Sequence, residues 1–414
     1  MRLRRITIVT SGHLSTCPRM LKAADAFASA SYQVRVVATC HEPWAIEADR
    51  DVRSRRPWPV EIVNYRRGES GMTYWWTGAR HKAARMAAAA FGPDRTPIPI
   101  VARAFGRVHT ELVRAIAAMP ADLIYGGTTG ALAPIAEAGR RMGVPYGIDL
   151  EDLHSGESSG PDAAFTDALA ARVERWVLER AAFATTSSEA IAGAYLDEYG
   201  VSPTVVHNTF SLPPRRPDFS RTDPGRLRIY WFSQTIGPDR GLEDAVLAAG
   251  RAGVPTELTL RGRPLPGYIG ALQALAAAHA PKLTVVHHAP APPDSMVDLA
   301  RGHDIGLALE QLNARNHGLA QSNKLFTYPL AGLAIAMTDT PGQHPVGVDF
   351  GDAAGLVPPG DVPALAAVFG RWATEPAALD AAKRAAWQAA ERRWHWEHEE
   401  ERGRLFQLVN QLAS

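Results

Sequence analysis

The chain has 414 residues, of which 46% are hydrophobic and 21% are charged, and its formal net charge is +1. This length exceeds what one hydrophobic core usually holds, so we expect two domains. The near-neutral charge argues against a dedicated nucleic-acid binder, which usually carries a basic excess. The two cysteines, Cys17 and Cys40, fit a reducing compartment, and no Cys/His cluster has the spacing of a structural zinc site.

The N-terminus is basic, but its apolar stretch covers only residues 6–9. That is too short for the core of a signal peptide, and it is typical of a first buried strand. No segment approaches the roughly 20 apolar residues that a membrane span needs. We therefore expect a cytoplasmic protein, which can rest on a membrane without crossing it.

Strand and helix patterns alternate through the first half of the chain. The expected strands cover residues 6–9, 33–39, 122–125, 146–148, 183–186 and 204–207. The expected helices cover residues 18–30, 101–119, 130–142, 165–182 and 189–199. This alternation predicts an α/β domain with a parallel, doubly wound sheet and helices on both faces.

A segment rich in Pro, Arg, Ser and Asp, residues 209–225, is typical of a linker. The alternation then resumes, with strands expected at 227–232, 256–261, 283–287, 304–309 and 334–337 and helices at 241–252, 267–279, 295–301 and 324–331. Three last helices are expected at 363–371, 377–393 and 397–412. We therefore predict domains at residues 1–208 and 226–375, followed by helices in residues 376–414 that cross back to the first domain.

Residues 322–343 are the most informative segment of the chain. Ser322, Asn323 and Lys324 form a polar, cationic turn before a short apolar helix, and Gly332 separates that helix from a buried strand. A helix N-terminus offers unpaired N–H groups and partial positive charge, and the lysine adds a full charge. This order of elements predicts an anion site in an α/β sheet.

The string Asn-Lys-Leu-Phe-Thr-Tyr-Pro-Leu-Ala-Gly at 323–332 resembles the donor-nucleotide segment of glycosyltransferase family 4. The resemblance covers most of the chain and implies the GT-B architecture, with two Rossmann-like domains facing across a cleft. The first domain would be on the acceptor side, and the second would bind the nucleotide sugar. Ser322, Asn323 and Lys324 would bind the donor, and Thr327 stands where the family has a ribose-binding glutamate. A surface lysine with a solvated head is the alternative for Lys324.

Residues 11–19 resemble the family's loop that approaches the donor diphosphate. Gly12 permits close approach of the backbone, and the guanidinium of Arg19 can make bidentate hydrogen bonds to a phosphate or a carboxylate. We therefore expect Gly12, His13 and Arg19 to bind the donor. The alternative is a surface loop whose arginine is merely solvated.

Residues 232–241 resemble another family loop, in which an arginine and a lysine grip the diphosphate. Arg240 stands at the position of the family's lysine, while Gln234 lies near that of its arginine. We expect both Gln234 and Arg240 to bind the donor, with one cation of the usual pair missing. A solvated side chain near a helix start is the alternative for Arg240.

Carboxylates and an imidazole follow the expected strand 146–148. These residues are Asp149, Glu151, Asp152 and His154. Similar enzymes often have a histidine here that contacts the sugar or the attacked centre, so Glu151 and His154 are candidate catalytic residues. Asp149 and Asp152 are candidates for holding acceptor hydroxyls. The cluster is equally typical of a helix N-cap, where negative charge is stabilising.

Glu310 is the third candidate catalytic residue. By the resemblance it is the glutamate near the donor sugar, provided that residues 311–319 form an inserted loop. We expect no metal and no cofactor, because GT-B enzymes bind the diphosphate through cations and helix dipoles.

Residues 75–91 have helical periodicity with two contrasting faces. One face carries Trp76, Ala79, Ala83, Met86, Ala87 and Ala90, and the opposite face carries Arg80, His81, Lys82 and Arg85. This pattern predicts a helix that lies on an anionic membrane or guards an acceptor. It is equally typical of a packed helix with a solvated basic face.

The resemblance implies a hexosyltransferase-like enzyme that moves a sugar from a nucleotide diphosphate to an acceptor hydroxyl, with retention, in polysaccharide or glycoconjugate biosynthesis. Its partners would be the nucleotide-sugar donor and a hydroxyl acceptor of unknown identity, not nucleic acid. The alternatives are a GT-B nucleotide-sugar epimerase or hydrolase and a non-catalytic sugar-nucleotide-binding scaffold. A dinucleotide fingerprint is absent, because Gly126-Gly127 lacks the required spacing.

Overall fold

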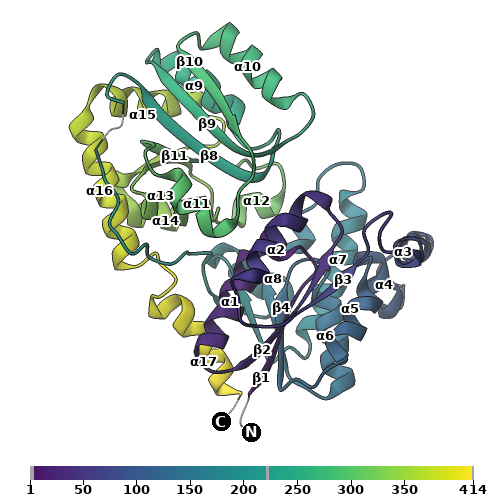
Figure 1. Cartoon of the computed structure of the whole chain (residues 1–414). Coiled ribbons are helices and arrows are strands. Elements are labelled where there is room, and N and C mark those ends of the chain that lie inside the picture. The colour runs from purple at the N-terminus through teal and green to yellow at the C-terminus, as the bar shows by residue number, and fades with distance from the viewer. Residues whose placement is uncertain (1–3, 221–222, 413–414) are drawn as a thin grey trace. The chain divides into compact units, whose positions relative to one another are not determined.

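The computed structural model describes residues 4–220 and 223–412, and its chain divides into two compact units. The N-terminal unit comprises the chain up to Val206 together with the segment from Arg402, and the C-terminal unit is His207–Glu401 (Figure 1). The expected linker at 209–225 therefore falls in the C-terminal unit. Its residues 221 and 222 lie outside the described residues, as do 1–3 and 413–414 at the ends of the first and last expected segments.

The N-terminal unit is built on a parallel sheet. Within the described residues its strands are β1 (Arg5–Thr10), β2 (Gln33–Cys40), β3 (Val60–Asn64), β4 (Leu123–Gly127), β5 (Tyr146–Leu150), β6 (Phe183–Thr186) and β7 (Thr204–Val205). Their order is β3-β2-β1-β4-β5-β6-β7, and every neighbouring pair is parallel. The order reverses between β1 and β4, which is the switch point of a doubly wound sheet. Strands β4, β5 and β6 are buried along their whole length because helices cover both faces.

Helices connect these strands. They are α1 (Pro18–Ser29), α2 (Ile46–Ser54), α3 (Met72–Phe91), α4 (Ile98–Phe105), α5 (His109–Ala117), α6 (Leu132–Met142), α7 (Ala163–Leu178), α8 (Glu189–Tyr199) and α17 (Arg404–Gln411). The helix expected at 101–119 is two helices, because the chain breaks at Gly106, where a Cβ would lie 3.2 Å from the carbonyl oxygen of Gly130. Strand β3 and helix α2 were not predicted.

The C-terminal unit repeats the same topology. Its strands within the described residues are β8 (Leu227–Ile236), β9 (Thr256–Pro264), β10 (Leu283–His288), β11 (Ile305–Ala308), β12 (Ala334–Thr338) and β13 (Ala354–Val357). Their order is β10-β9-β8-β11-β12-β13, with the reversal between β8 and β11, and all pairs are parallel. The predicted fold class, α/β with two doubly wound Rossmann-like domains, is confirmed.

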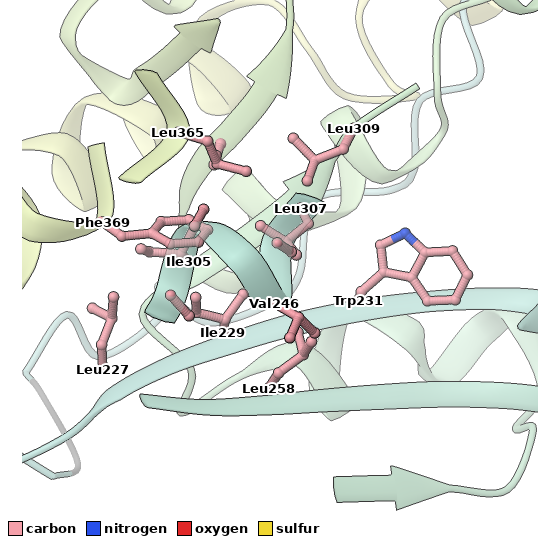
Figure 2. Packing of buried hydrophobic residues seen from close by; sticks show 14 of the residues in the cluster. Leu227, Ile229, Trp231, Val246, Leu258, Ile305, Leu307, Leu309, Leu365 and Phe369 are labelled. Atoms are coloured by element: carbon pink, nitrogen blue, oxygen red, sulfur yellow. The ribbon is translucent and has the colours of Figure 1, made fainter. Parts of the chain in front are cut away.

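The helices of this unit are α9 (Leu242–Ala252), α10 (Tyr268–His279), α11 (Met296–Ala300), α12 (Arg315–Leu319), α13 (Lys324–Ala331), α14 (His344–Phe350), α15 (Val362–Thr374) and α16 (Pro376–Arg392). On one face of the sheet, Ile229 of β8 and Leu307 of β11 pack with Val246 of α9 and Phe369 of α15 (Figure 2). Burial of each such side chain contributes roughly 1.5–3 kcal/mol to folding. The sheet is therefore a rigid base for the loops at its edge.

On the other face, α13 packs directly against β11. The Tyr328 ring covers Gly306 so closely that a Cβ there would lie 2.1 Å from it, and the Tyr328 hydroxyl donates to the carbonyl of Leu307 at 2.9 Å. Gly332 ends the helix in the left-handed conformation, with φ of +79°. These contacts fix where the helix begins, and thereby fix the position of Lys324.

Candidate functional site

The loops that follow β8 and β11 meet at the switch point of the C-terminal sheet. Ligands of open α/β sheets bind at the carboxyl ends of the strands at such a point. Gly241 adopts φ of +66°, and a Cβ there would lie 2.6 Å from the Cβ of Leu309. Only glycine permits this approach. The contact therefore brings Arg240, the neighbour of Gly241, and Glu310, the neighbour of Leu309, to the same edge of the sheet.

Lys324 lies between Glu310 and Ser322 at this edge. Its Nζ is 3.5 Å from Glu310 Oε1 and 3.1 Å from Ser322 Oγ, and it lies 5.4 Å from the ring centroid of Trp231. Lys324 is only 7% exposed. A buried ammonium group is costly unless it is paired, so the alternative of a solvated surface lysine is wrong.

The charges in this site favour an anionic ligand. The pKa of Lys324 is lowered. Burial lowers it most, the Glu310 carboxylate raises it, and the positive charge of Arg240 lowers it further. Burial would raise the pKa of Glu310, but the charges of Lys324 and Arg240 outweigh it and lower that pKa. Among the described residues, no carboxylate lies within ion-pair distance of Arg240. Only Lys324 is paired with Glu310, so the charge of Arg240 adds to the site without a carboxylate beside it.

Two helix N-termini add to the positive potential. Helix α13 begins at Lys324 and α9 begins at Leu242, and neither has a side-chain cap on its first N–H groups. Such groups can bind a phosphate. Asn323 is the N-cap residue of α13, but its side chain makes no capping bond.

Thr327 makes a hydrogen bond within its own helix. Its side chain is fully buried, and its hydroxyl donates to the carbonyl of Asn323 at 3.2 Å, one turn back in the helix. The ribose contact expected for Thr327 stays a prediction. Gln234 is exposed in a bulged part of β8, where the pairing with β9 shifts between Phe232 and Thr235, and its donor role stays a prediction.

A buried layer beneath Glu310 was not predicted. The Thr338 hydroxyl donates to the carbonyl of Glu310 at 2.8 Å, and the Gln343 amide donates to the carbonyls of Ala308 and Thr338 at 3.1 and 3.0 Å. These bonds tie the loop after β12 to the loop after β11. In the sequence, Gln343 had no signal beyond being a polar residue close to the Lys324 segment.

In the N-terminal unit, Arg19 and Asp149 bind each other. Nε and Nη2 of Arg19 donate to the two oxygens of Asp149 at 2.9 and 2.6 Å, and Nη1 donates to the carbonyl of Val206 at 2.6 Å. Both side chains are buried. These contacts favour a structural pairing inside the unit, and the donor role expected for Arg19 and the acceptor role expected for Asp149 stay predictions.

His13 is also a structural residue. Its Nδ1 lies 2.6 Å from Asp49 Oδ2, and its Nε2 accepts the backbone N–H groups of His41 and Glu42 at 3.1 and 2.9 Å. This geometry requires the neutral ring with the proton on Nδ1. His13 therefore joins the loops after β1 and β2, and the donor contact expected for it stays a prediction.

Gly12 is explained by packing in the same region. A Cβ there would lie 2.7 Å from the sulfur of Cys17. The turn therefore requires a glycine whether or not a ligand approaches it. Its donor role remains a prediction.

His154 is the residue of the acidic cluster that is set up for binding. It is 3% exposed, and its Nδ1 lies 3.0 Å from Glu157 Oε2, while its buried Nε2 has no partner among the described residues. Burial alone would lower the pKa of His154, but the hydrogen bond and charge of Glu157 raise it to about 9. The imidazolium thus holds a proton on Nε2 that has no acceptor among the described residues.

Glu151 and Asp152 are half-buried beside it. Burial raises the pKa of Glu151 to about 7, the charge of Arg19 opposes this, and Asp152 adds to it. The helix N-cap alternative is not what the structure shows, because the helical turn that follows, η3 (His154–Gly156), has Leu153 as its N-cap residue. Glu151 and His154 remain candidates for acid–base work, since such groups function best near neutral pKa values.

In residues 4–220 and 223–412, no three His, Cys, Asp or Glu side chains are grouped so that they could hold a metal ion. No helix in these ranges is long and apolar enough to cross a bilayer.

Comparisons with known proteins agree with this architecture. Residues 18–209 match the family model of the glycosyl transferase 4-like domain. No curated protein matches the chain.

Several solved structures share the fold over nearly the whole chain. HepE from Anabaena, in complex with UDP and glucose, is 15% identical, with a TM-score of 0.66 over 99% of this chain and 98% of that one. Sucrose-phosphate synthase from Thermosynechococcus elongatus is 14% identical, with a TM-score of 0.66 over 99% and 100%. TarM from S. aureus is 7% identical, with a TM-score of 0.68 over 99% of both chains. Residues 18–209 are thus similar to the glycosyl transferase 4-like domain, and the chain as a whole shares the two-domain GT-B fold of these structures.

Proposed function

We propose that the chain is a retaining glycosyltransferase that moves a hexose from a nucleoside diphosphate to an acceptor hydroxyl. The cluster of Lys324, Arg240 and Glu310 at the switch point of the C-terminal sheet carries the proposal. It offers two cations and two uncapped helix N-termini to a dianionic group, and one ionised carboxylate to sugar hydroxyls.

The cations would act on the leaving group. When the bond between the sugar and the diphosphate breaks, negative charge develops on the phosphate oxygen. Lys324 and Arg240 would stabilise that charge where it appears, without reorganising at the moment of reaction. The pKa of Lys324 is lowered, and the negative charge of a bound diphosphate would raise it again.

Glu310 would orient the donor sugar. Its pKa is lowered, so it stays ionised and accepts hydrogen bonds from hydroxyls. We propose no covalent nucleophile: the departing phosphate would help to deprotonate the acceptor, which attacks on the face that the leaving group vacates. Attack on that face would keep the anomeric configuration of the sugar.

The acceptor would be bound by the N-terminal unit. His154 offers a proton on a buried nitrogen, and Glu151 and Asp152 offer carboxyl groups at the carboxyl edge of β5. A hydroxyl-bearing glycan or glycoconjugate precursor fits these groups, because each sugar hydroxyl both donates and accepts. HepE, a protein of the same fold, has been solved with UDP-glucose, so UDP-glucose is the first donor to test.

The experiment is a transfer assay on the purified chain. UDP-, GDP- and ADP-hexoses would be supplied with and without a panel of alkyl glycosides, and products followed by NMR. We expect nucleoside diphosphate release that depends on the acceptor, with the anomeric configuration of the donor kept. Free sugar or an epimer formed without any acceptor would contradict the transferase, and inversion would contradict the retaining mechanism.

A further inference from the structure

Helix α3 exposes a wide apolar face. Met72, Trp75, Trp76, Met86 and Phe91 are each between 63% and 70% exposed. The first four lie on one face of the helix, and Phe91 is its last residue. We call these five residues the α3 apolar face. Single exposed hydrophobic residues are ordinary, but a contiguous set marks an interaction surface.

Three of the four residues on the basic face of α3 contact neighbouring helices, and the fourth, Lys82, is exposed. Arg80 Nη2 donates to Glu111 Oε2 at 2.5 Å, His81 Nδ1 lies 2.8 Å from the carbonyl of Arg103, and the Arg85 guanidinium lies 4.9 Å from the ring centroid of Phe165. The alternative of a packed helix with a solvated basic face is therefore wrong for this helix. Figure 1 shows α3 at the periphery of the N-terminal unit, next to α4.

The surroundings of α3 are strongly basic. Residues 66–107 contain eight Lys and Arg but only two Asp and Glu, whereas the whole chain has 44 and 43. Arg67, Lys82 and Arg95, which lie before, within and after α3 in the chain, are exposed. Of the two acids, Glu69 is paired with Arg66, and Asp94 is exposed beside Arg95 in the sequence. The segment that carries the apolar face thus has a net positive charge.

We propose that α3 docks the protein on a bilayer that contains anionic lipid. The α3 apolar face would enter the boundary between headgroups and acyl chains, with Trp75 and Trp76 at the interface. Arg67, Lys82 and Arg95 would contact lipid phosphates. Dimerisation through the same face is disfavoured, because it would bring two copies of this basic segment together.

Contacts link α3 to the loops at the carboxyl edge of the N-terminal sheet. Arg107 donates to the carbonyl of Tyr74 at 2.7 Å and stacks on the rings of Tyr74 and Tyr65, at 4.4 and 5.3 Å from their centroids. Tyr65 in turn stacks on His41, with centroids 4.9 Å apart. Docking through α3 would therefore set the orientation of this edge to the bilayer, which suits an acceptor that is carried by a lipid.

Co-sedimentation with vesicles tests the proposal on the full chain. Phosphatidylcholine vesicles with and without phosphatidylglycerol would be compared. We expect binding only with the anionic lipid, weakened about tenfold or more by the double change Trp75→Ser with Trp76→Ser. Lys82→Glu with Arg95→Glu should also weaken it, and added salt should do the same. Leu196→Ser, at an exposed leucine of α8, is the matched control and should bind as the parent does.

Unchanged vesicle binding in the tryptophan variant would overturn the proposal. So would a wild-type chain that ignores the vesicles and forms a dimer that the same variant dissociates, as judged by light scattering. Circular dichroism shows whether the variants are folded. Neither readout depends on glycosyl transfer, so this test stands apart from that of the proposed function.

Discussion

Arg19 and Asp149 are 130 residues apart in the chain, yet their side chains form a buried, two-point ion pair. The pair joins helix α1 to the end of β5. Burial would raise the pKa of Asp149, but the charge and hydrogen bonds of Arg19 lower it. Arg19 also donates a hydrogen bond to the carbonyl of Val206, the residue at which the chain leaves the N-terminal unit.

We predict that Arg19→Met destabilises the N-terminal unit by about 3–5 kcal/mol, because it leaves the Asp149 carboxylate buried and unpaired. Calorimetry should show a lowered unfolding temperature for that unit and an unchanged transition for the other. Donor affinity, measured by titration with UDP-glucose, should stay the same. A variant of normal stability that has lost donor affinity would show that Arg19 is a phosphate ligand.

We predict that Lys324→Ala lowers kcat/KM for transfer by roughly 10²–10³-fold, the usual cost of removing one preorganised group that stabilises charge in the transition state. The matched control is Lys282→Ala, since Lys282 is exposed and bonds only the carbonyl of Gly253 in the described structure. That variant should keep full activity. Equal activity of the Lys324 variant and the control would mean that the diphosphate binds elsewhere.

Local signals were enough to predict the Lys324 segment. The helix start, Lys324 and the terminating Gly332 lie within ten residues, so spacing along the chain fixes them. The bond of Thr327 to the carbonyl of Asn323 could not be predicted in the same way, because register along the chain does not show where a hydroxyl points. A buried threonine in a helix often makes that bond.

Contacts between distant segments could not be predicted. Nothing in the sequence pairs Arg19 with Asp149 or His13 with Asp49, because such partners are chosen by the fold. The same holds for α3: periodicity separated its apolar face from its basic face, but not which of them meets solvent. The partners Glu111 and Phe165, which draw Arg80 and Arg85 inward, come from other helices.

We predict that Glu310→Gln lowers kcat much more than it weakens nucleotide binding. The amide has nearly the same shape, but it cannot accept hydrogen bonds from sugar hydroxyls as a carboxylate does. UDP, which lacks the sugar, should bind at least as tightly, because removing the negative charge leaves Lys324 and Arg240 unopposed. Isothermal titration with UDP and with UDP-glucose separates the two effects. Weaker UDP binding in the variant would place Glu310 on the nucleotide.

The last prediction concerns His154 and the pH dependence of stability. Its pKa rises from the ordinary 6.5 to about 9 because of Glu157, so the folded protein keeps a proton that the unfolded chain loses between these values. This contribution is complete below about pH 6.5 and is lost as the pH rises through about 9. Glu157 is partly exposed, so we expect about 2 kcal/mol from the pair. Glu157→Gln should therefore lower the unfolding temperature near pH 6, and its difference from the parent should vanish near pH 10. A difference that grows with pH would show that His154 is neutral in the folded protein.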